Sequence, residues 1–255
     1  TGAGDVDGPV SQAKINQVHS MVVDKDNNVY FLDASMKKVR KFNASNGTVE
    51  TFRPINNQFN WDYSQNGKVT HYDYTNFYPE ILAYNNINNG LYLLGHNQGY
   101  SQIFELTPAV SLATYGESSL SGRFFRIDDK NNFVYGTGFD GFQSASSNIY
   151  TSQIGTKANL IASSLDSTGV GFSNVASGDT GLLYPMDVIS INGNIFVFDT
   201  YFKKISKIQL FPRKVEAVIS FDNISFDSVT TYDGKFYLSS GTTIYELTTD
   251  GKLTT

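Results

Sequence analysis

The sequence contains no cysteine, one tryptophan and only three histidines. Without cysteine the chain cannot form disulfides, use a thiol nucleophile or hold zinc through thiolates. It has no apolar run near the roughly 18 to 20 residues that a membrane-spanning helix needs, so we expect no membrane span. The formal net charge of −5 argues against a nucleic-acid partner, because phosphate backbones bind positively charged surfaces.

The chain is long and apolar enough for one sizeable core. Of its 255 residues, 40% are hydrophobic and 14% aromatic, and an all-β ring of about 250 residues forms without a domain boundary. We predict a single domain over residues 1–255, with insertions at about 53–78 and 163–183, and a monomer. The N-terminus lacks the pattern of a signal peptide, but a mature chain can still be exported. We leave the compartment open and favour a secreted or cell-surface location.

The segment 22–52 predicts a small antiparallel sheet. Its apolar runs are rich in β-branched and aromatic residues, and its turns are rich in Asp, Asn and Lys, a pattern typical of short strands joined by tight turns. The runs are 22–23, 29–32, 39–42 and 48–52. Four antiparallel strands in roughly 40 residues have the size of one β-propeller blade. One blade cannot bury both its faces, so we expect neighbours of the same kind.

The same part of the chain resembles an NHL repeat. The resemblance is carried by Gly4-Asp5-Val6-Asp7-Gly8, Ala13, Val22-Val23-Asp24, Asn28-Val29-Tyr30-Phe31-Leu32-Asp33 and Val39-Arg40-Lys41-Phe42. It departs from the family pattern at Val18-His19-Ser20-Met21, where that family has a Pro-Ser/Gly-Ile lead. The resemblance implies an NHL-type β-propeller. Some NHL proteins bind RNA, but the negative charge of this chain weakens that reading.

The pattern returns four times along the chain. The second strands align on Tyr30, Tyr92, Val134, Phe196 and Tyr237. The alignment steps are about one or one and a half times the roughly 40 residues of a propeller blade. We therefore predict an all-β propeller of four-stranded antiparallel blades, with five blades counted, or six if the insertion at 53–78 forms a degenerate blade. No long segment with helical periodicity interrupts this pattern.

The long loops of this architecture all fall on one face. Turns alternate between the two ends of a meander, so second-to-third-strand turns and blade-to-blade connections share one rim. These loops are rich in aromatic residues, which supply large contact area at low entropic cost. Loops on one rim of a rigid scaffold are where binding sites lie. The ligand-binding residues that we predict there are Trp61, Tyr63, His71, Tyr74, His96, Asn97, Tyr100, Phe142 and Tyr201.

Packing is the competing explanation for part of this set. A long insertion needs its own small core, and the segment from Phe59 to Tyr74 reads as a hairpin that packs on itself, with Gln65-Asn66-Gly67 as its turn. For Trp61 and Tyr63 the two interpretations stay open. For Tyr100, Phe142 and Tyr201, in polar or glycine-rich loops, we expect exposure.

Catalytic and metal motifs are weak. Asp24-x-Asp26-x-Asn28 begins like a calcium loop but lacks its glycine and closing Glu, so we read it as a hairpin turn, and we read Asp5-x-Asp7-Gly8 as a turn as well. No spacing motif links His19, His71 and His96 into a zinc triad. Calcium-dependent propeller enzymes need acidic and Asn ligands in a central channel, for which the candidates are Asn16, Asp24, Asp187 and Asn223. We predict no catalytic residue, no metal ligand and no cofactor, with Ca²⁺ as the alternative.

The sequence therefore predicts a non-catalytic recognition module that binds a protein or glycan ligand through its aromatic-rich loop face. The alternative is a Ca²⁺-dependent lactonase-like, esterase-like or lyase-like propeller enzyme with a metal in the central channel. Fold alone does not decide between them.

Overall fold

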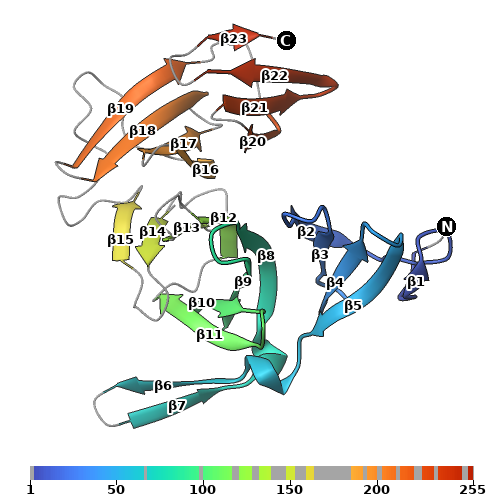
Figure 1. Cartoon of the computed structure of the whole chain (residues 1–255). Coiled ribbons are helices and arrows are strands. Elements are labelled where there is room, and N and C mark those ends of the chain that lie inside the picture. The colour runs from blue at the N-terminus through green and yellow to red at the C-terminus, as the bar shows by residue number, and fades with distance from the viewer. Residues whose placement is uncertain are drawn as a thin grey trace. The chain divides into compact units, whose positions relative to one another are not determined.

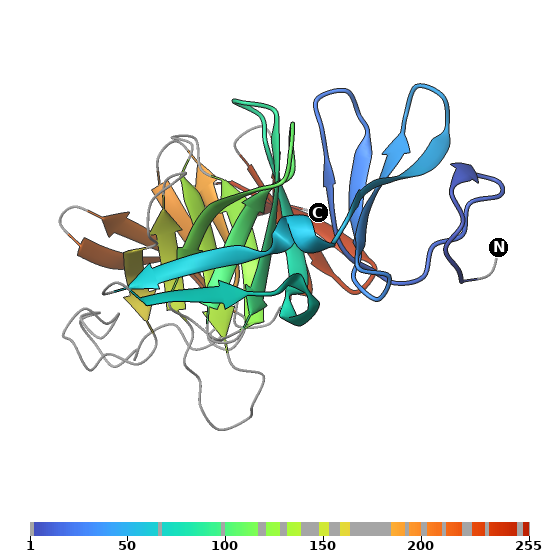
Figure 2. The same cartoon turned by 90° about the horizontal axis from the view of Figure 1, so that it is seen from below.

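Antiparallel strands make up almost all of the regular structure in the computed structural model (Figures 1 and 2). The structure describes residues 3–65, 68–97, 100–116, 121–127, 132–138, 148–152, 159–163, 185–191, 194–199, 203–210, 213–220, 226–232, 235–248 and 252–254. Within these ranges there are two short 3-10 helices, and no helix has the length and apolar character to cross a bilayer. The chain divides into two compact units, one holding β1 to β11 and the other β12 to β23.

The first unit contains two meander sheets. One has the order β1-β5-β4-β3-β2 and the other β11-β10-β9-β8, with antiparallel pairing throughout. The strands are β1 (Gly8–Pro9), β2 (Val18–Val23), β3 (Val29–Asp33), β4 (Lys38–Asn43), β5 (Thr48–Pro54), β8 (Tyr78–Asn85), β9 (Gly90–Asn97), β10 (Tyr100–Glu105) and β11 (Ser111–Gly116). Strands β2 and β8 of the two sheets lie together, where the Leu82 amide donates a 3.0 Å hydrogen bond to the Ser20 hydroxyl.

The second unit contains three further four-stranded antiparallel meanders. Their strands are β12 (Ser121–Ile127), β13 (Phe133–Gly138), β14 (Asn148–Ser152), β15 (Asn159–Ser163), β16 (Pro185–Ile191), β17 (Asn194–Asp199), β18 (Lys204–Leu210), β19 (Arg213–Ser220), β20 (Ser228–Tyr232), β21 (Lys235–Ser240), β22 (Thr243–Leu247) and β23 (Leu253–Thr254). Two of the sheets share a core in which the Phe236 ring packs edge-on against Phe196 and Phe198, with centroids 5.1 and 5.3 Å away.

The predicted strands are confirmed in all five sheets, and so is the all-β propeller-type organisation. The count of five blades, or six, in one ring stays a prediction. The insertion at 53–78 forms a two-stranded sheet instead of a four-stranded one. The single-domain assignment stays a prediction, and the insertion predicted at about 163–183 lies almost entirely outside the described residues.

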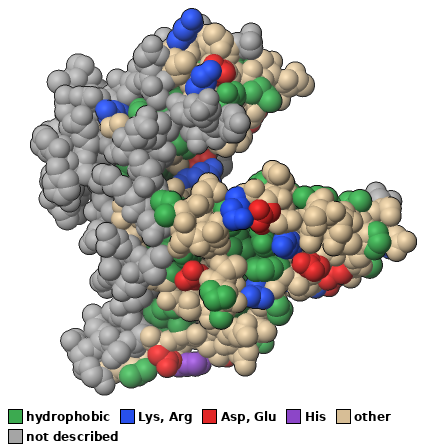
Figure 3. All heavy atoms as spheres, in the orientation of Figure 1, with side chains coloured by type: hydrophobic (Ala, Val, Ile, Leu, Met, Phe, Trp, Pro, Cys, Tyr) green, Lys and Arg blue, Asp and Glu red, His purple; other side chains and the backbone are tan. Residues whose placement is uncertain are grey.

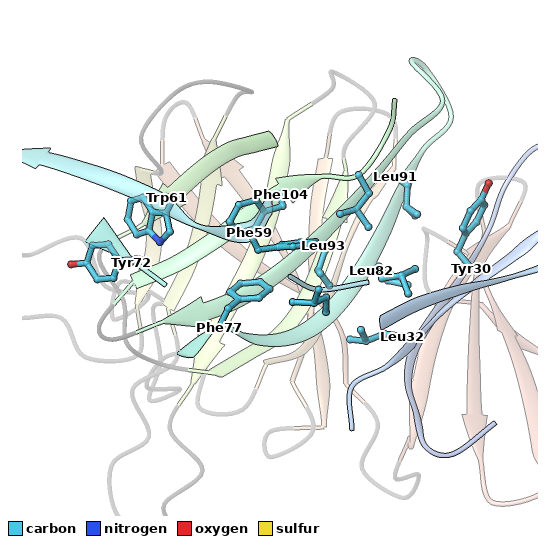
Figure 4. Close-up of a cluster of buried hydrophobic side chains, with 13 residues drawn as sticks. Tyr30, Leu32, Phe59, Trp61, Tyr72, Phe77, Leu82, Leu91, Leu93 and Phe104 are labelled. Carbon is cyan, nitrogen blue, oxygen red and sulfur yellow. The ribbon is translucent and has the colours of Figure 1, made fainter. Parts of the chain in front are cut away.

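The core of the first unit lies between its two sheets (Figure 4). Leu32 from β3 and Leu82, Leu91 and Leu93 from the second sheet are almost wholly buried there. Arg53 joins the same two sheets at the surface, where its guanidinium donates to the carbonyl oxygens of Leu106 and Pro108 at 3.1 and 2.8 Å. The two sheets of the first unit therefore bury one apolar face against each other, which is what the repeated pattern requires.

The insertion is tied into this core through aromatic rings. Two 3-10 turns, η1 (Asn57–Phe59) and η2 (Tyr74–Asn76), flank the hairpin of β6 (Trp61–Gln65) and β7 (Lys68–Tyr72). Phe59 stacks on Phe77, with centroids 5.7 Å apart, and meets Phe104 edge-on. Trp61, only 6% exposed, stacks on Tyr72 at 4.6 Å. Figure 4 shows these rings along one side of the cluster. The predicted hairpin is confirmed, and for Trp61 the packing interpretation holds.

The N-terminal segment is pinned to the first sheet by a fully buried arginine. The Arg40 guanidinium donates to Asp7 Oδ1 at 2.6 and 3.1 Å and to the carbonyl oxygens of Val6 and Lys14 at 2.7 and 2.6 Å. Asp7 Oδ2 accepts from the Thr51 amide at 2.7 Å. Burial raises the pKa of Asp7, but the hydrogen bonds from Thr51 and Arg40 outweigh it and lower that pKa below its usual value. Asp7 thus has a structural role.

We expect Asp7→Asn to lower the free energy of unfolding at pH 7 by about 1 to 2 kcal/mol, because Arg40 stays buried without its carboxylate while Asp7 itself is partly exposed. The lowered pKa means that the ionised carboxylate stabilises the fold above its unfolded-state pKa. This contribution is lost as pH falls through the folded-state pKa, so wild type and variant should converge below about pH 4. Urea denaturation across pH measures the difference.

Asp5→Asn is the matched control. Asp5 pairs with Lys38 at 2.6 Å, and Lys38 is partly exposed whereas Arg40 is fully buried, so this ion pair should contribute under about 1 kcal/mol. An Asp7→Asn effect no larger than the Asp5→Asn effect at pH 7 would contradict the pinning role of Arg40.

We expect Trp61→Ala to destabilise the protein by about 3 to 5 kcal/mol, as truncation of a buried aromatic ring does. Trp61→Phe should lose much less, because it keeps a ring to stack on Tyr72. Denaturation followed by circular dichroism measures this, since Trp61 is the chain's one tryptophan and the variants lose its fluorescence. A Trp61→Ala variant with wild-type stability would return this ring to the set of exposed, ligand-facing aromatics.

Candidate functional site

A small aromatic and polar cluster lies at the end of the second sheet where the long loops were expected. Tyr78 begins β8 and His96 is the penultimate residue of β9, and the two are directly opposite in the antiparallel register. Their rings stack with centroids 5.0 Å apart and an interplanar angle of 13°. Tyr78 is 59% exposed, so this pair presents an aromatic surface to solvent.

A carboxylate orients the imidazole of this pair. Glu80 Oε1 lies 3.0 Å from His96 Nδ1, and the two side chains are 15% and 22% exposed. An ionised carboxylate only accepts hydrogen bonds, so Nδ1 must carry a proton and donate to Glu80. In the neutral ring, Nε2 then holds the lone pair, and it makes no hydrogen bond to any residue that the structure describes. His96 Nε2 is therefore an oriented acceptor beside the exposed Tyr78 ring.

A β-bulge brings Glu80 to this position. The register of β8 against β9 runs from Pro79 opposite Gly95 to Ile81 opposite Leu94, which leaves Glu80 as the extra residue. Bulges of this kind redirect a side chain and are frequent next to functional sites. Glu80, the bulge residue, contacts His96 on the paired strand.

Gly95 makes room for the cluster. A Cβ atom at Gly95 would lie 2.4 Å from both Phe77 Cζ and the Tyr78 carbonyl oxygen. Phe77 belongs to the core, and the second of these atoms is backbone, so neither can shift easily. Only glycine therefore lets the start of β8 approach β9 closely enough to put the two rings in contact.

Asn97 secures the neighbouring turn. Its Nδ2 donates to the Asp73 carbonyl oxygen at 3.0 Å, and Asp73 Oδ1 caps η2 by accepting from the Thr75 amide at 2.7 Å. These bonds hold η2 just ahead of Tyr78. Asn97 is 2% exposed, and its Oδ1 has no hydrogen-bond partner among the described residues. A buried amide oxygen in this state calls for a water molecule or a ligand donor.

The remaining predicted site residues do not all gather at this cluster. His71 lies exposed on the hairpin, with Nδ1 2.7 Å from Asp62 Oδ1, and a pair so open to solvent contributes little stability. Tyr74 is half-buried in η2, and Trp61 is buried. Tyr63 lies in β6 and Tyr100 begins β10. Phe142 and Tyr201 lie outside the described residues.

Sequence reasoning selected His96 and Asn97 but neither Tyr78 nor Glu80. Residues i and i+2 of a strand lie on one face of the sheet, so the spacing of Tyr78 and Glu80 was the sequence signal that could have grouped them. The bulge itself leaves no mark in the residue types. The stacking of Tyr78 on His96 and the pairing of Glu80 with His96 appear only once β8 is paired with β9.

The calcium candidates are engaged in the structure. Asp24 accepts from the amides of Asp26 and Asn28, both at 2.9 Å, and from the Asn28 side chain. Burial raises the pKa of Asp24, but these hydrogen bonds outweigh it and lower that pKa overall. It closes the hairpin turn, as the sequence predicted. Asn16 donates to the Ser35 hydroxyl at 2.7 Å.

Asp187 is held in a different way. It lies buried on β16, where it pairs with Arg126 from β12 and accepts from the Val188 amide at 2.8 Å. Burial raises the pKa of Asp187, and Arg126 opposes this only in part. Asn223 lies outside the described residues. Among the residues that the structure describes, no group of three or more His, Asp or Glu side chains could hold a metal ion.

Charges of both signs are interspersed on the face seen in Figure 3, and neither Lys and Arg nor Asp and Glu gather there into one large patch. The described part of that face offers no extended single-sign surface to a highly charged partner.

No protein-family model matches the chain, and no curated protein matches it. Solved structures do match. A Bacteroides thetaiotaomicron protein of unknown function aligns with a TM-score of 0.65 and 14% identity over 100% of this chain and 62% of its own length. A chain of the nidogen/laminin complex aligns with a TM-score of 0.59 and 13% identity, over 91% of this chain and 75% of that chain. A Xanthomonas campestris gluconolactonase aligns with a TM-score of 0.56 and 12% identity, over 89% of this chain and 71% of its own length.

This chain thus spans less than two thirds of the Bacteroides protein. Identities this low carry no information on activity, and the likeness shows the fold alone. The four-stranded meanders and these neighbours together place the chain among the β-propellers.

Proposed function

We propose that the protein is a non-catalytic recognition module that binds a protein or glycan ligand through its aromatic-rich loop face. The observation that carries this proposal is the exposed Tyr78 ring stacked on His96 at the strand ends of the second sheet. An exposed aromatic ring with a fixed polar neighbour is typical of a binding anchor. Glu80 and Asn97 complete the site, and Tyr63, His71, Tyr74, Tyr100, Phe142 and Tyr201 stay proposed ligand contacts on the same loop face.

The way in which these groups are held supports binding. Glu80 fixes the tautomer of His96, Gly95 admits the ring contact and Asn97 holds η2, so the surface is organised before any ligand arrives. Preorganisation of this kind lowers the entropic cost of association. A related propeller structure was solved as a complex of nidogen with laminin, which is compatible with a binding role.

The alternative function is a metal-dependent propeller enzyme, and the Xanthomonas gluconolactonase is one of the neighbours that favour it, with a calcium-binding regucalcin as another. Its metal would need a set of oxygen ligands, but Asp24 closes a turn and Asp187 pairs with Arg126. The candidate residues that the structure describes therefore do not fit a Ca²⁺ site, and we derive no reaction step through one.

The same proposal includes a finer architecture. The five meander sheets are blades of one NHL-type propeller domain, with five blades in the ring or six if a further partial blade is counted. We further propose a monomer that works at the cell surface or after secretion. The meander sheets support the assignment of blades. The net charge of −5 supports the monomer, because like charges oppose self-association.

The experiment compares Tyr78→Ala with wild type on arrays of purified glycans and purified extracellular proteins. We expect wild type to bind at least one probe and Tyr78→Ala to bind it at least tenfold more weakly, a change of about 1.4 kcal/mol. Thermal melts of both should coincide, because the Tyr78 ring is mostly exposed.

Ile87→Ala is the matched control. Ile87 is 61% exposed in the turn between β8 and β9, at the opposite end of the same strand pair. Its binding should equal that of wild type. Equal losses in the two variants would place the ligand elsewhere, and turnover of glucono-δ-lactone that needs Ca²⁺ and survives Tyr78→Ala would favour the enzyme.

A further inference from the structure

The size of the exposed apolar surface around Tyr78 limits what can bind there. In the described part of the second sheet, Tyr78 and Ile87 are the large hydrophobic residues that are well exposed, and they lie at opposite ends of β8. A stable protein interface buries about 800 Å² on each side and clusters several anchors. Among the described residues of this sheet, the single exposed ring of Tyr78 does not supply this. It does match the area of a ligand that is itself about the size of one ring.

The surroundings of the ring are polar. Thr75 and Asn76 in η2 are exposed just ahead of Tyr78, and Asp73 caps the same turn. A hydroxyl-rich ligand can make hydrogen bonds here around its contact with the ring, whereas a purely apolar ligand would strip these groups of water without replacing it.

The acceptor at His96 adds chemical specificity. Because Nδ1 donates to Glu80, neutral His96 can take a hydrogen bond at Nε2 from a donor on the ligand. A sugar hydroxyl is such a donor. The Glu80 carboxylate beside His96 is an acceptor and offers no donor to an anionic ligand.

We infer that the Tyr78–His96–Glu80 cluster is a subsite for a neutral pyranose, either a free sugar or the terminal residue of a glycan. This rests on the recognition function proposed above and names the ligand class. The C–H face of the sugar packs on the solvent-facing side of the Tyr78 ring. One sugar hydroxyl donates to His96 Nε2. Glu80 acts as a positioning residue that keeps His96 in the accepting tautomer.

The test uses the full chain and saturation-transfer NMR with the methyl glycosides of glucose, galactose, mannose and N-acetylglucosamine. A site with one ring and one hydrogen bond should bind its preferred sugar with a dissociation constant of about 1 mM. The strongest transfer should fall on the protons of one sugar face. An array of immobilised neutral and sialylated oligosaccharides then separates free sugars from glycan termini and neutral from acidic ligands.

Variants assign the contacts. Tyr78→Phe keeps the ring and should bind within about twofold of wild type, while Tyr78→Ala should lose about tenfold or more. His96→Phe keeps an aromatic surface but removes Nε2, so it should bind about fivefold or more weakly. Ile87→Ala should be unchanged. A melt of each variant shows that it is folded.

Deoxy sugars test the hydrogen bond itself. One monodeoxy form of the preferred glycoside should bind wild type more weakly than the parent sugar. The same deoxy form should bind His96→Phe as well as the parent sugar does, because the acceptor is already gone. An equal loss in both proteins would show that His96 does not contact that hydroxyl, and if this held for every position the acceptor role would be wrong.

The outcomes separate this inference from the function on which it rests. If no neutral sugar binds but a purified protein binds in a Tyr78-dependent manner, the saccharide inference is wrong and the recognition function stands. If acidic glycans are preferred, the assignment to a neutral ligand is wrong. If sugars bind and Tyr78→Ala has no effect, both the subsite and the proposed site are overturned.

Discussion

The structure depends on the burial of sheet faces against one another. A four-stranded meander has two faces, and a single one cannot hide both from water, so each sheet is stable only beside a neighbour. In the first unit, Leu32, Leu82 and Leu93 close the space between two sheets, and the rings of the inserted hairpin extend the same core. In the second unit, Phe236 has the same role between two other sheets. This constraint explains why the apolar pattern repeats along the chain.

Arg40 shows how a polar group is accommodated within such a scaffold. A fully buried guanidinium is tolerated because each of its nitrogens donates a hydrogen bond. The acceptors are Asp7 and the carbonyl oxygens of Val6 and Lys14. The burial of one charge therefore orders the chain ahead of the first full strand. The glycine- and aspartate-rich lead of the repeat thus has a physical reason that does not involve a metal ion.

The candidate site uses the rigidity of the second sheet. Tyr78 and His96 lie at strand ends, directly opposite each other, so backbone pairing fixes the positions of the two stacked rings. Glu80, the bulge residue, and Gly95 adjust the local geometry without loosening it. The result is a solvent-facing ring beside an oriented acceptor, which suits recognition better than it suits chemistry that needs several converging reactive groups.

The sequence by itself determined the strands, the turns and the meander topology, because these follow from local periodicity and turn chemistry. It could not decide between packing and exposure for Trp61, since both roles need the same residue type. Only the tertiary structure stacked Trp61 on Tyr72 and buried it. It also brought Tyr78, Glu80 and His96 together, because a bulge and a cross-strand register are set by pairing between segments and not by the residues within one.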